Sequence, residues 1–313
     1  MGSFFHAVHV FGDRLAAVHW TFLALALALY LARLVCRAIA WRAILTAAYP
    51  DRRPKLRSAF GAYVAGVGVN SIAPARAGDV IKLYLIKHRI PEASYATLTP
   101  TLLVETLFDF FVGVALMLWA LSLGVLPTHD VYSHLPSVDW GFFVRHEKWT
   151  AIGVAAAATA ALIGFIVFLE KGEAFRARIG RGFAIVRTPS RFLTRVVLPQ
   201  ALSWGLRLAT MYYFLRAFAV HASVHNALLA MVVDSLATLF PATPGGAGTK
   251  QGLIVFVFAG QAVSATALLA FSVGMNIAIV VFNVVLGGLA LFAMARTLSW
   301  RRLRAAHAEE AAK

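Results

Sequence analysis

Two carboxylates four residues apart, Glu105 and Asp109, lie inside a long apolar run and would share one face of a helix. Arg207 lies near the middle of a second apolar run, and Asp234 lies within a third. Charged side chains are costly inside a membrane, so they usually pair with one another or serve a polar site. Two neighbouring carboxylates also disfavour joint ionisation. These residues could therefore form ion pairs, bind a charged group or transfer a proton.

Proline and glycine interrupt the apolar sequence at two places, NSIAPARAGDVIK from residue 70 and PATPGGAGTKQG from residue 241. An irregular backbone at membrane depth must be buried in protein or line a polar cavity, because unpaired backbone groups are costly in lipid. The glycines of the second break leave helix-end N–H groups free, and such ends favour anions. The alternative is that both breaks are turns at the membrane surface, which suits the basic first break better than the second.

A polar stripe marks the last apolar run, where Ser272, Asn276 and Asn283 are spaced to share a helix face. Four predicted helices thus each present a polar face. One interpretation is a set of buried ion pairs, such as Asp109 with Arg207, that holds a helix bundle together. The other is a polar cavity between these helices that receives a ligand.

The elements that must position these residues are transmembrane helices. Hydrophobic residues make up 60% of the 313-residue chain and charged residues 14%, whereas soluble proteins average about 25% charged residues. Several apolar runs approach the roughly 20 residues that a helix needs to cross a bilayer. The run TFLALALALYLARLV does not alternate as a strand of a membrane barrel does. We expect an all-α integral membrane protein.

Charge, cysteine and motif content exclude other classes. The net charge is +15, but the basic residues lie mostly in short loops, where they contact anionic lipid, so we expect no nucleic-acid partner. The single cysteine, Cys36, excludes an intrachain disulfide or a cysteine metal cluster. His221 and His225 have metal-ligand spacing but no accompanying carboxylate motif, and no HExxH, Walker or GxSxG motif occurs. We expect no metal and no cofactor.

The apolar runs predict a single transmembrane domain with polar segments around it. The domain would cover 17–295, with a first half at about 17–124 and a second at about 149–295. Around it would lie an interfacial segment at 1–16, an outer loop at 125–148 and a basic cytoplasmic tail at 296–313. Full spans are expected at about 19–42, 95–124, 149–170, 196–218 and 265–295.

Positive residues in short loops favour the cytoplasmic side of a membrane. Inside by this rule lie the C-terminus and the loops at 43–57 and 171–195; outside lie the N-terminus and the loops at 125–148 and 219–226. The segment 58–90 must then enter and leave on the inner side, and 226–262 on the outer side. Two interrupted segments at matching places in two halves indicate an inverted repeat, here a polytopic bundle with two oppositely oriented re-entrant hairpins. An ordinary bundle of seven or eight complete spans is the alternative.

Three motifs resemble those of the lysylphosphatidylglycerol synthase transmembrane-region family. The segment from Asn70 to Lys82 is similar to its N-x3-P-x-R-x-G-[DE]-x2-R pattern, and ETLFD at 105–109 looks like its ERxxD. Its PGGxG signature is matched by Pro244, Gly245, Gly246 and Gly248. RLVCRAIAWRAIL resembles its first cytoplasmic helix end, so the resemblance covers about 25–295. It implies a module that moves a lipid with a polar headgroup between leaflets.

Three departures from the family pattern bear on function. Thr106 stands where the family usually has arginine, so a neighbour that would pair with the two carboxylates is missing. Gln251 stands where the family often has glutamate, with Lys250 beside it, so this site is less acidic. We expect the family's usual additional N-terminal span to be reduced to 1–16 and its soluble aminoacyl-transfer domain to be absent. Aminoacyl transfer is therefore not implied.

We expect a lipid flippase or transporter, not an enzyme, that moves a lipid with an anionic or zwitterionic headgroup across the cytoplasmic membrane of a bacterium or archaeon. Its partners would be membrane lipids, such as an anionic phospholipid or an isoprenoid phosphate, and a homodimer is left open. The candidate headgroup-binding residues are Asn70, Arg76, Asp79, Lys82, Glu105, Asp109, Arg207, Asp234, Pro244, Gly245, Gly246, Gly248, Lys250, Gln251 and Asn276.

The charged candidates divide by role. The cations Arg76, Lys82, Arg207 and Lys250 would take an anionic phosphate. The acids Asp79, Glu105, Asp109 and Asp234 would orient those cations, receive a basic headgroup or carry a coupling proton. Two rival classes are an enzyme that acts on a lipid headgroup, with one of the paired carboxylates as base, and an accessory protein that scaffolds envelope synthesis.

Overall fold

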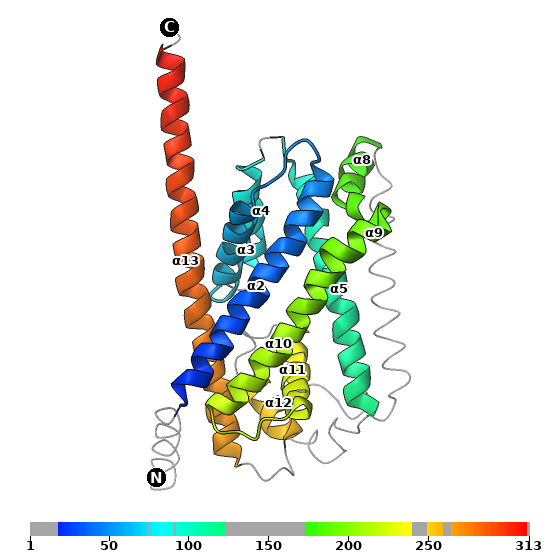
Figure 1. The fold of residues 1–313 in the computed structure, drawn as a ribbon, viewed down its shortest axis with the longest axis vertical. Coiled ribbons are helices and arrows are strands. Elements are labelled where there is room, and N and C mark those ends of the chain that lie inside the picture. The colour runs from blue at the N-terminus through cyan, green and yellow to red at the C-terminus, as the bar shows by residue number, and fades with distance from the viewer. Residues whose placement is uncertain are drawn as a thin grey trace.

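The fold is a bundle of helices (Figure 1). The computed structural model describes residues 18–73, 76–90, 92–122, 173–239, 249–258 and 264–311, and within them all regular structure is helical. The longer helices are α2 (Trp20–Ala48), α5 (Tyr95–Ser122), α10 (Leu198–Ala217) and α13 (Ala265–Ala311). The shorter ones are α3 (Leu56–Asn70), α4 (Ala77–Lys87), α8 (Glu173–Gly182), η3 (Ala184–Arg187), α9 (Pro189–Phe192), the π turn η4 (Leu193–Val197), α11 (Val224–Leu239) and α12 (Thr249–Val257). The prediction of an all-α membrane protein is confirmed.

Three of the described helices are long and apolar enough to cross a membrane. They are α2, the Tyr95–Leu116 part of α5, and the Thr266–Arg296 part of α13, where spans were predicted at 19–42, 95–124 and 265–295. The expected span at 196–218 forms η4 and α10, which carry Gln200, Arg207 and Arg216 and do not reach that apolarity. The expected span at 149–170, the loop at 125–148 and the segment at 1–16 lie outside the described residues.

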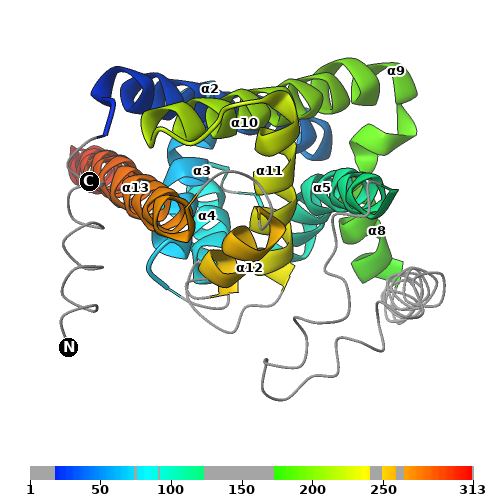
Figure 2. The same ribbon diagram turned by 90° about the horizontal axis from the view of Figure 1, so that it is seen from below.

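Helices α2 and α10 run antiparallel and pack along their whole length (Figures 1 and 2). At one end of the pair, the His19 N–H donates a 2.9 Å hydrogen bond to the Ala217 carbonyl. Toward the other end, Val196 is buried in one cluster with Ala40 and Ile44. This register places the middle of α2 against the middle of α10, so Arg33 and Arg207 come from neighbouring levels of the two helices.

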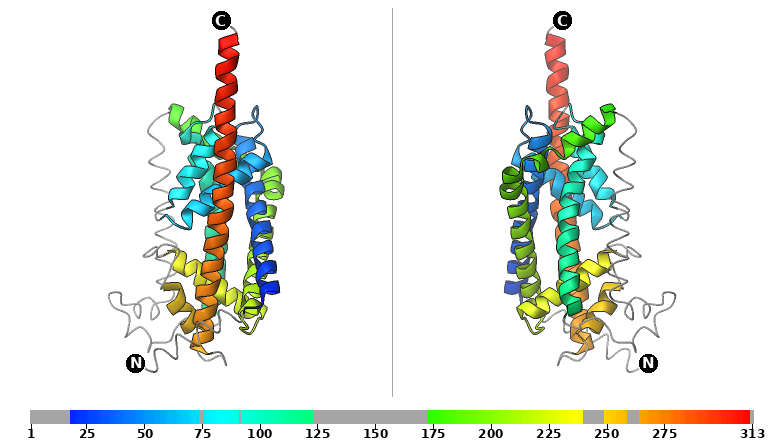
Figure 3. Two further views of the ribbon diagram at one scale, coloured as in Figure 1. Left: turned by 90° about the vertical axis from the view of Figure 1, so that its left-hand side faces the viewer. Right: turned by 90° about the vertical axis from the view of Figure 1, so that its right-hand side faces the viewer.

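Two short helical hairpins lie in opposite halves of the bundle (Figure 3). Helices α3 and α4 pack together beside the half of α2 that ends at Ala48, and α4 returns to the end of the bundle at which α3 begins. Helices α11 and α12 pack together in the other half, toward the end of the bundle at which α2 begins. The segment 58–90 therefore forms a helical hairpin, and its re-entry into the membrane from the inner side stays a prediction. The residues that join α11 to α12, 240–248, lie outside the described residues.

Basic segments gather at one end of the bundle, which we call the basic end (Figure 1). It comprises the loop 49–55, helices α8 and α9, and the C-terminal part of α13. The opposite end carries the start of α2, the loop 218–223 and the start of α13. Helix α13 continues past Arg296 to Ala311, so most of the expected C-terminal tail is helical.

The first hairpin closes through glycine and asparagine. A Cβ added to Gly78 would lie 2.7 Å from Asn70 Oδ1 and nearer still to the Gly66 carbonyl oxygen, so only glycine fits there. The Gly78 N–H donates a 2.7 Å hydrogen bond to Asn70 Oδ1, and Arg76 adopts a left-handed conformation with φ 56°. The side chain of Asn70, a candidate headgroup ligand, thus holds α3 and α4 together at their turn.

The same hairpin packs on α13 through a second pair of glycines. A Cβ added to Gly287 would lie 2.7 Å from Gly68 Cα, and one added to Gly68 would lie 2.7 Å from the Asn283 carbonyl oxygen. Such contacts let two helix backbones approach closely, which is how helices commonly associate in membranes. Gly288, one residue along, has open space around it.

The two adjacent glycines of α13 offer a matched test of this contact. We expect Gly287→Ala to lower the free energy of unfolding by about 1–3 kcal/mol relative to Gly288→Ala, because the added methyl group overpacks the α3–α13 contact. Both substitutions bring the same gain in helix propensity. The difference between their free energies of unfolding therefore measures the cost of the steric clash at Gly287. Thermal unfolding of the detergent-solubilised variants measures it, and equal midpoints would contradict the close α3–α13 packing.

Candidate functional site

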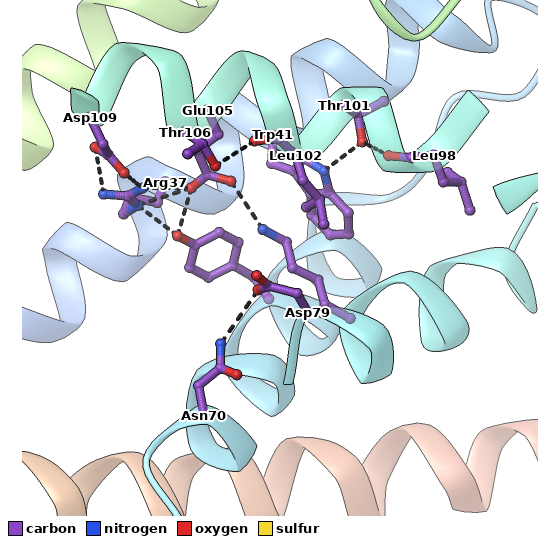
Figure 4. A network of polar contacts seen from close by, with 12 residues as sticks. Arg37, Trp41, Asn70, Asp79, Leu98, Thr101, Leu102, Glu105, Thr106 and Asp109 are labelled. Carbon is purple, nitrogen blue, oxygen red and sulfur yellow. Dashed lines mark hydrogen bonds and ion pairs between the residues drawn. The ribbon is translucent and has the colours of Figure 1, made fainter. Parts of the chain in front are cut away.

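A buried network of charges joins α2 to α5 (Figure 4). Arg37 of α2 donates from Nε to Glu105 Oε1 at 3.0 Å and from Nη1 to Asp109 Oδ1 at 3.1 Å. Its Nη2 lies 2.9 Å from Glu105 Oε1 and also pairs with Asp109 Oδ2. One guanidinium thus binds both carboxylates, and their four-residue spacing on α5 is what lets it reach the two together.

The first hairpin adds a phenol and an ammonium to this network. Tyr63 of α3 accepts a hydrogen bond from Arg37 Nε at 2.6 Å and donates one to Glu105 Oε1 at 2.6 Å. Lys82 of α4 donates from Nζ to Glu105 Oε2 at 3.0 Å. The same Nζ lies 3.9 Å from the centre of the Tyr63 ring and 4.3 Å from that of Trp41, so two aromatic faces and one carboxylate enclose it.

These groups form the first network, which we define as Arg37, Tyr63, Lys82, Glu105 and Asp109. It holds two cations and two carboxylates, and every charge has an opposite partner. Glu105 and Lys82 each expose only 6% of their side chains, so water screens their attraction little. The positive and negative charges of the first network therefore balance.

A second cluster forms where α10 meets the other hairpin. Arg207 of α10 donates from Nη2 to Asp234 Oδ2 of α11 at 2.7 Å and to Ser235 Oγ at 3.3 Å. Lys250 of α12 forms an ion pair with the second oxygen, Asp234 Oδ1. We call Arg207, Asp234 and Lys250 the second cluster; it links both helices of the second hairpin to a long helix.

One tryptophan lies between the two groups. Trp204 donates from Nε1 to Asp109 Oδ1 at 3.0 Å, and the guanidinium carbon of Arg207 lies 4.7 Å from the centre of a Trp204 ring. The first network and the second cluster are thus adjacent, and together they connect both hairpins with α2, α5 and α10. The sequence left open whether the polar faces form buried ion pairs or line a polar cavity. The described residues form buried ion pairs, in two adjacent groups.

The expected pairing of Asp109 with Arg207 is wrong. Asp109 pairs with Arg37 of α2, and Arg207 pairs with Asp234 of α11. Thr106, which replaces a family arginine, is exposed and donates its hydroxyl to the Leu102 carbonyl at 3.0 Å. The carboxylates of α5 therefore find their partners on α2 and α4, not on their own helix.

The remaining candidates lie around these groups. Asp79 Oδ1 is 3.4 Å from Asn70 Nδ2 at the hairpin turn, where Arg76 is exposed. Asn276 of α13 and Gln251 of α12 are half-buried. Outside the described residues lie Pro244, Gly245, Gly246 and Gly248. Where the structure does describe the chain, no group of three His, Cys, Asp or Glu side chains could hold a metal ion.

Sequence reasoning missed Arg37, Tyr63, Trp41 and Trp204. A signal existed for Arg37, which follows Arg33 by four residues inside an apolar run, but both arginines were placed at the end of a span. Helix α2 continues to Ala48, so Arg37 is interior. The three aromatic residues gave no signal, because aromatic side chains are ordinary in membrane helices.

Arg37 can be tested against an exposed arginine. We expect Arg37→Met to lower the free energy of unfolding by about 3–5 kcal/mol, because it leaves two carboxylates without their shared cation. The control, Arg52→Met, removes an ion pair with Glu92 whose side chains are 64% and 54% exposed, and should cost about 0–1 kcal/mol. Chemical unfolding in detergent measures both changes. Equal losses of unfolding free energy in the two variants would contradict the claim that Arg37 neutralises two carboxylates inside the bundle.

Comparison with known proteins gives one family match and two relatives. Residues 4–287 match the family described as "Lysylphosphatidylglycerol synthase TM region". The chain is 24% identical over 287 residues to a UPF0104 membrane protein of Methanothermobacter thermautotrophicus, covering 84% of this chain and 81% of that protein. It is 22% identical over 199 residues to one of Methanocaldococcus jannaschii, covering 60% of this chain and 78% of that protein. No solved structure matches the chain.

Proposed function

Because the chain belongs to the lysylphosphatidylglycerol synthase transmembrane-region family, we propose that it binds the headgroup of a membrane lipid and moves that lipid between leaflets. The observation that carries this proposal is the pair of adjacent charged groups between two hairpins from opposite halves of the bundle (Figure 3). A headgroup is polar and its chains are apolar, so a polar site inside an apolar bundle suits a lipid whose chains stay in the bilayer.

The hairpins supply an alternating route to this site. In the proposal both are re-entrant, with α3 and α4 entering from the basic end and α11 and α12 from the opposite end, as in an inverted repeat. Lys82 ties the first hairpin to Glu105 of α5, and Asp234 ties the second to Arg207 of α10. If one of these two ion pairs breaks while the other stays intact, the site would open to one leaflet at a time.

The orientation of the protein follows from its charge. The basic end would face the cytoplasm, because Lys and Arg in short loops are retained there. That assignment puts the C-terminal part of α13 inside and the start of α2 toward the outer leaflet, in the inner membrane of a bacterium or archaeon. The exposed apolar side chains of α13, such as Ile277, Val281 and Phe292, would then face lipid.

Lipid movement in proteoliposomes tests the function directly. Fluorescent phosphatidylglycerol is placed in both leaflets, and a quencher that cannot cross the membrane is added outside. In protein-free vesicles the quencher should remove about half of the fluorescence, that of the outer leaflet. Vesicles with wild-type protein should lose more than half, in a second phase of quenching, because lipid from the inner leaflet reaches the outside. Arg207→Gln should slow that phase by about tenfold or more, the expected effect of losing hydrogen bonds to a charged group. Arg52→Gln, which removes the same charge at an exposed site, should leave the rate unchanged.

The same vesicles separate the rival classes. Mass spectrometry of the lipid after incubation should show an unchanged headgroup. A changed headgroup mass would favour an enzyme, and an unchanged lipid that never crosses would favour an accessory protein. Either result would overturn the transport proposal.

A further inference from the structure

The two charged groups differ in their balance of charge. In the first network two cations face two carboxylates. In the second cluster Arg207 and Lys250 share the single carboxylate of Asp234. Asp79 and Arg76, at the first hairpin turn, add one charge of each sign. Among these groups of described residues, the surplus of positive charge therefore lies at the second cluster.

A third cation lies beside that cluster. Arg33 of α2 is half-buried, its guanidinium carbon lies 5.6 Å from the centre of the Tyr30 ring, and it has no carboxylate partner among the described residues. The register of α2 against α10 puts it within about one helical turn of the level of Arg207. The two guanidinium groups repel each other, so an anion between them would relieve that repulsion.

The first network, in contrast, already holds an ammonium group. Tyr63, Trp41 and Glu105 surround the Nζ of Lys82 with two ring faces and a carboxylate. Aromatic faces with a carboxylate are the surroundings that bind ammonium ligands such as choline. Lys82 thus fills, from within the chain, the place that an amine headgroup would need.

We infer that the lipid is anionic and carries no ammonium group, and that its phosphate binds between Arg33 and Arg207 and displaces Asp234 from Arg207 and Lys250. This inference rests on the proposed function and names its substrate class. Asp234 is then the counter-ion of Arg207 and Lys250 while no lipid is bound. At release, its carboxylate competes with the phosphate for these cations and replaces it. Lys82 is the residue that excludes amine headgroups.

Binding to the purified full-length protein in detergent tests the inference apart from transport. Fluorescent phosphatidylglycerol should bind wild-type protein about tenfold or more tightly than fluorescent phosphatidylcholine, whose phosphate carries a quaternary ammonium group in place of glycerol. Arg33→Gln and Arg207→Gln should each weaken phosphatidylglycerol binding by a similar factor, whereas Arg52→Gln should not. Equal affinity for the two lipids, or no effect of either buried arginine, would overturn the inference.

Asp234→Asn distinguishes a displaced counter-ion from a structural carboxylate. It should bind phosphatidylglycerol several-fold more tightly than wild type and yet move it more slowly in vesicles, because the competitor that releases the phosphate is gone. Weaker or unchanged binding by a folded Asp234→Asn protein would overturn the role given to Asp234.

Lys82→Met tests the ammonium site independently. With the lysine removed, the ring faces and Glu105 should accept an external ammonium, so phosphatidylcholine binding should rise several-fold while phosphatidylglycerol binding stays near the wild-type value. No gain by a folded Lys82→Met protein would overturn the exclusion of amines; if that variant does not fold, the comparison of the two lipids on wild-type protein decides. Wild-type selectivity for phosphatidylglycerol without lipid movement would refute transport and leave the binding inference standing.

Discussion

Charge neutralisation in an apolar interior is the constraint on which the rest of the structure depends. A buried charge without a partner costs several kcal/mol, so each must find an opposite charge or a polar ligand. Arg37 satisfies Glu105 and Asp109 together, and Lys82 satisfies the remaining oxygen of Glu105. Three helices from separate parts of the sequence, α2, α4 and α5, must therefore meet at one point.

Ion pairs and close glycine contacts hold the helices together in different ways. Glycine pairs such as Gly66 with Gly78 and Gly68 with Gly287 bring backbones close and favour one rigid packing. Ion pairs are different, because a ligand of the right charge can replace either partner. In the proposed mechanism the hairpins would move as rigid units while the ion pairs exchange, the first hairpin together with the part of α13 that packs on it. The uneven balance of charge indicates which pair would exchange.

Much of the fold could be predicted, because span length, helix breaks and basic loops follow from the physics of a bilayer. The hairpin at 58–90 and the charged candidates on α5, α10 and α11 were identified that way. Their pairing could not be predicted, since which cation meets each carboxylate depends on how α2 packs against α5 and how α11 packs against α10. Arg37 was overlooked because an arginine near the end of an apolar run normally extends to the interface, whereas α2 continues for eleven residues beyond it.

The position of a bound headgroup is the central prediction. A structure of the protein in lipid nanodiscs that contain phosphatidylglycerol, determined by electron cryomicroscopy, would test it. We predict phosphate density within hydrogen-bonding distance of Arg207, with Asp234 displaced and Lys82 still between Trp41 and Tyr63. A headgroup bound in the first network, or lipid density confined to the outer surface of the bundle, would contradict the account.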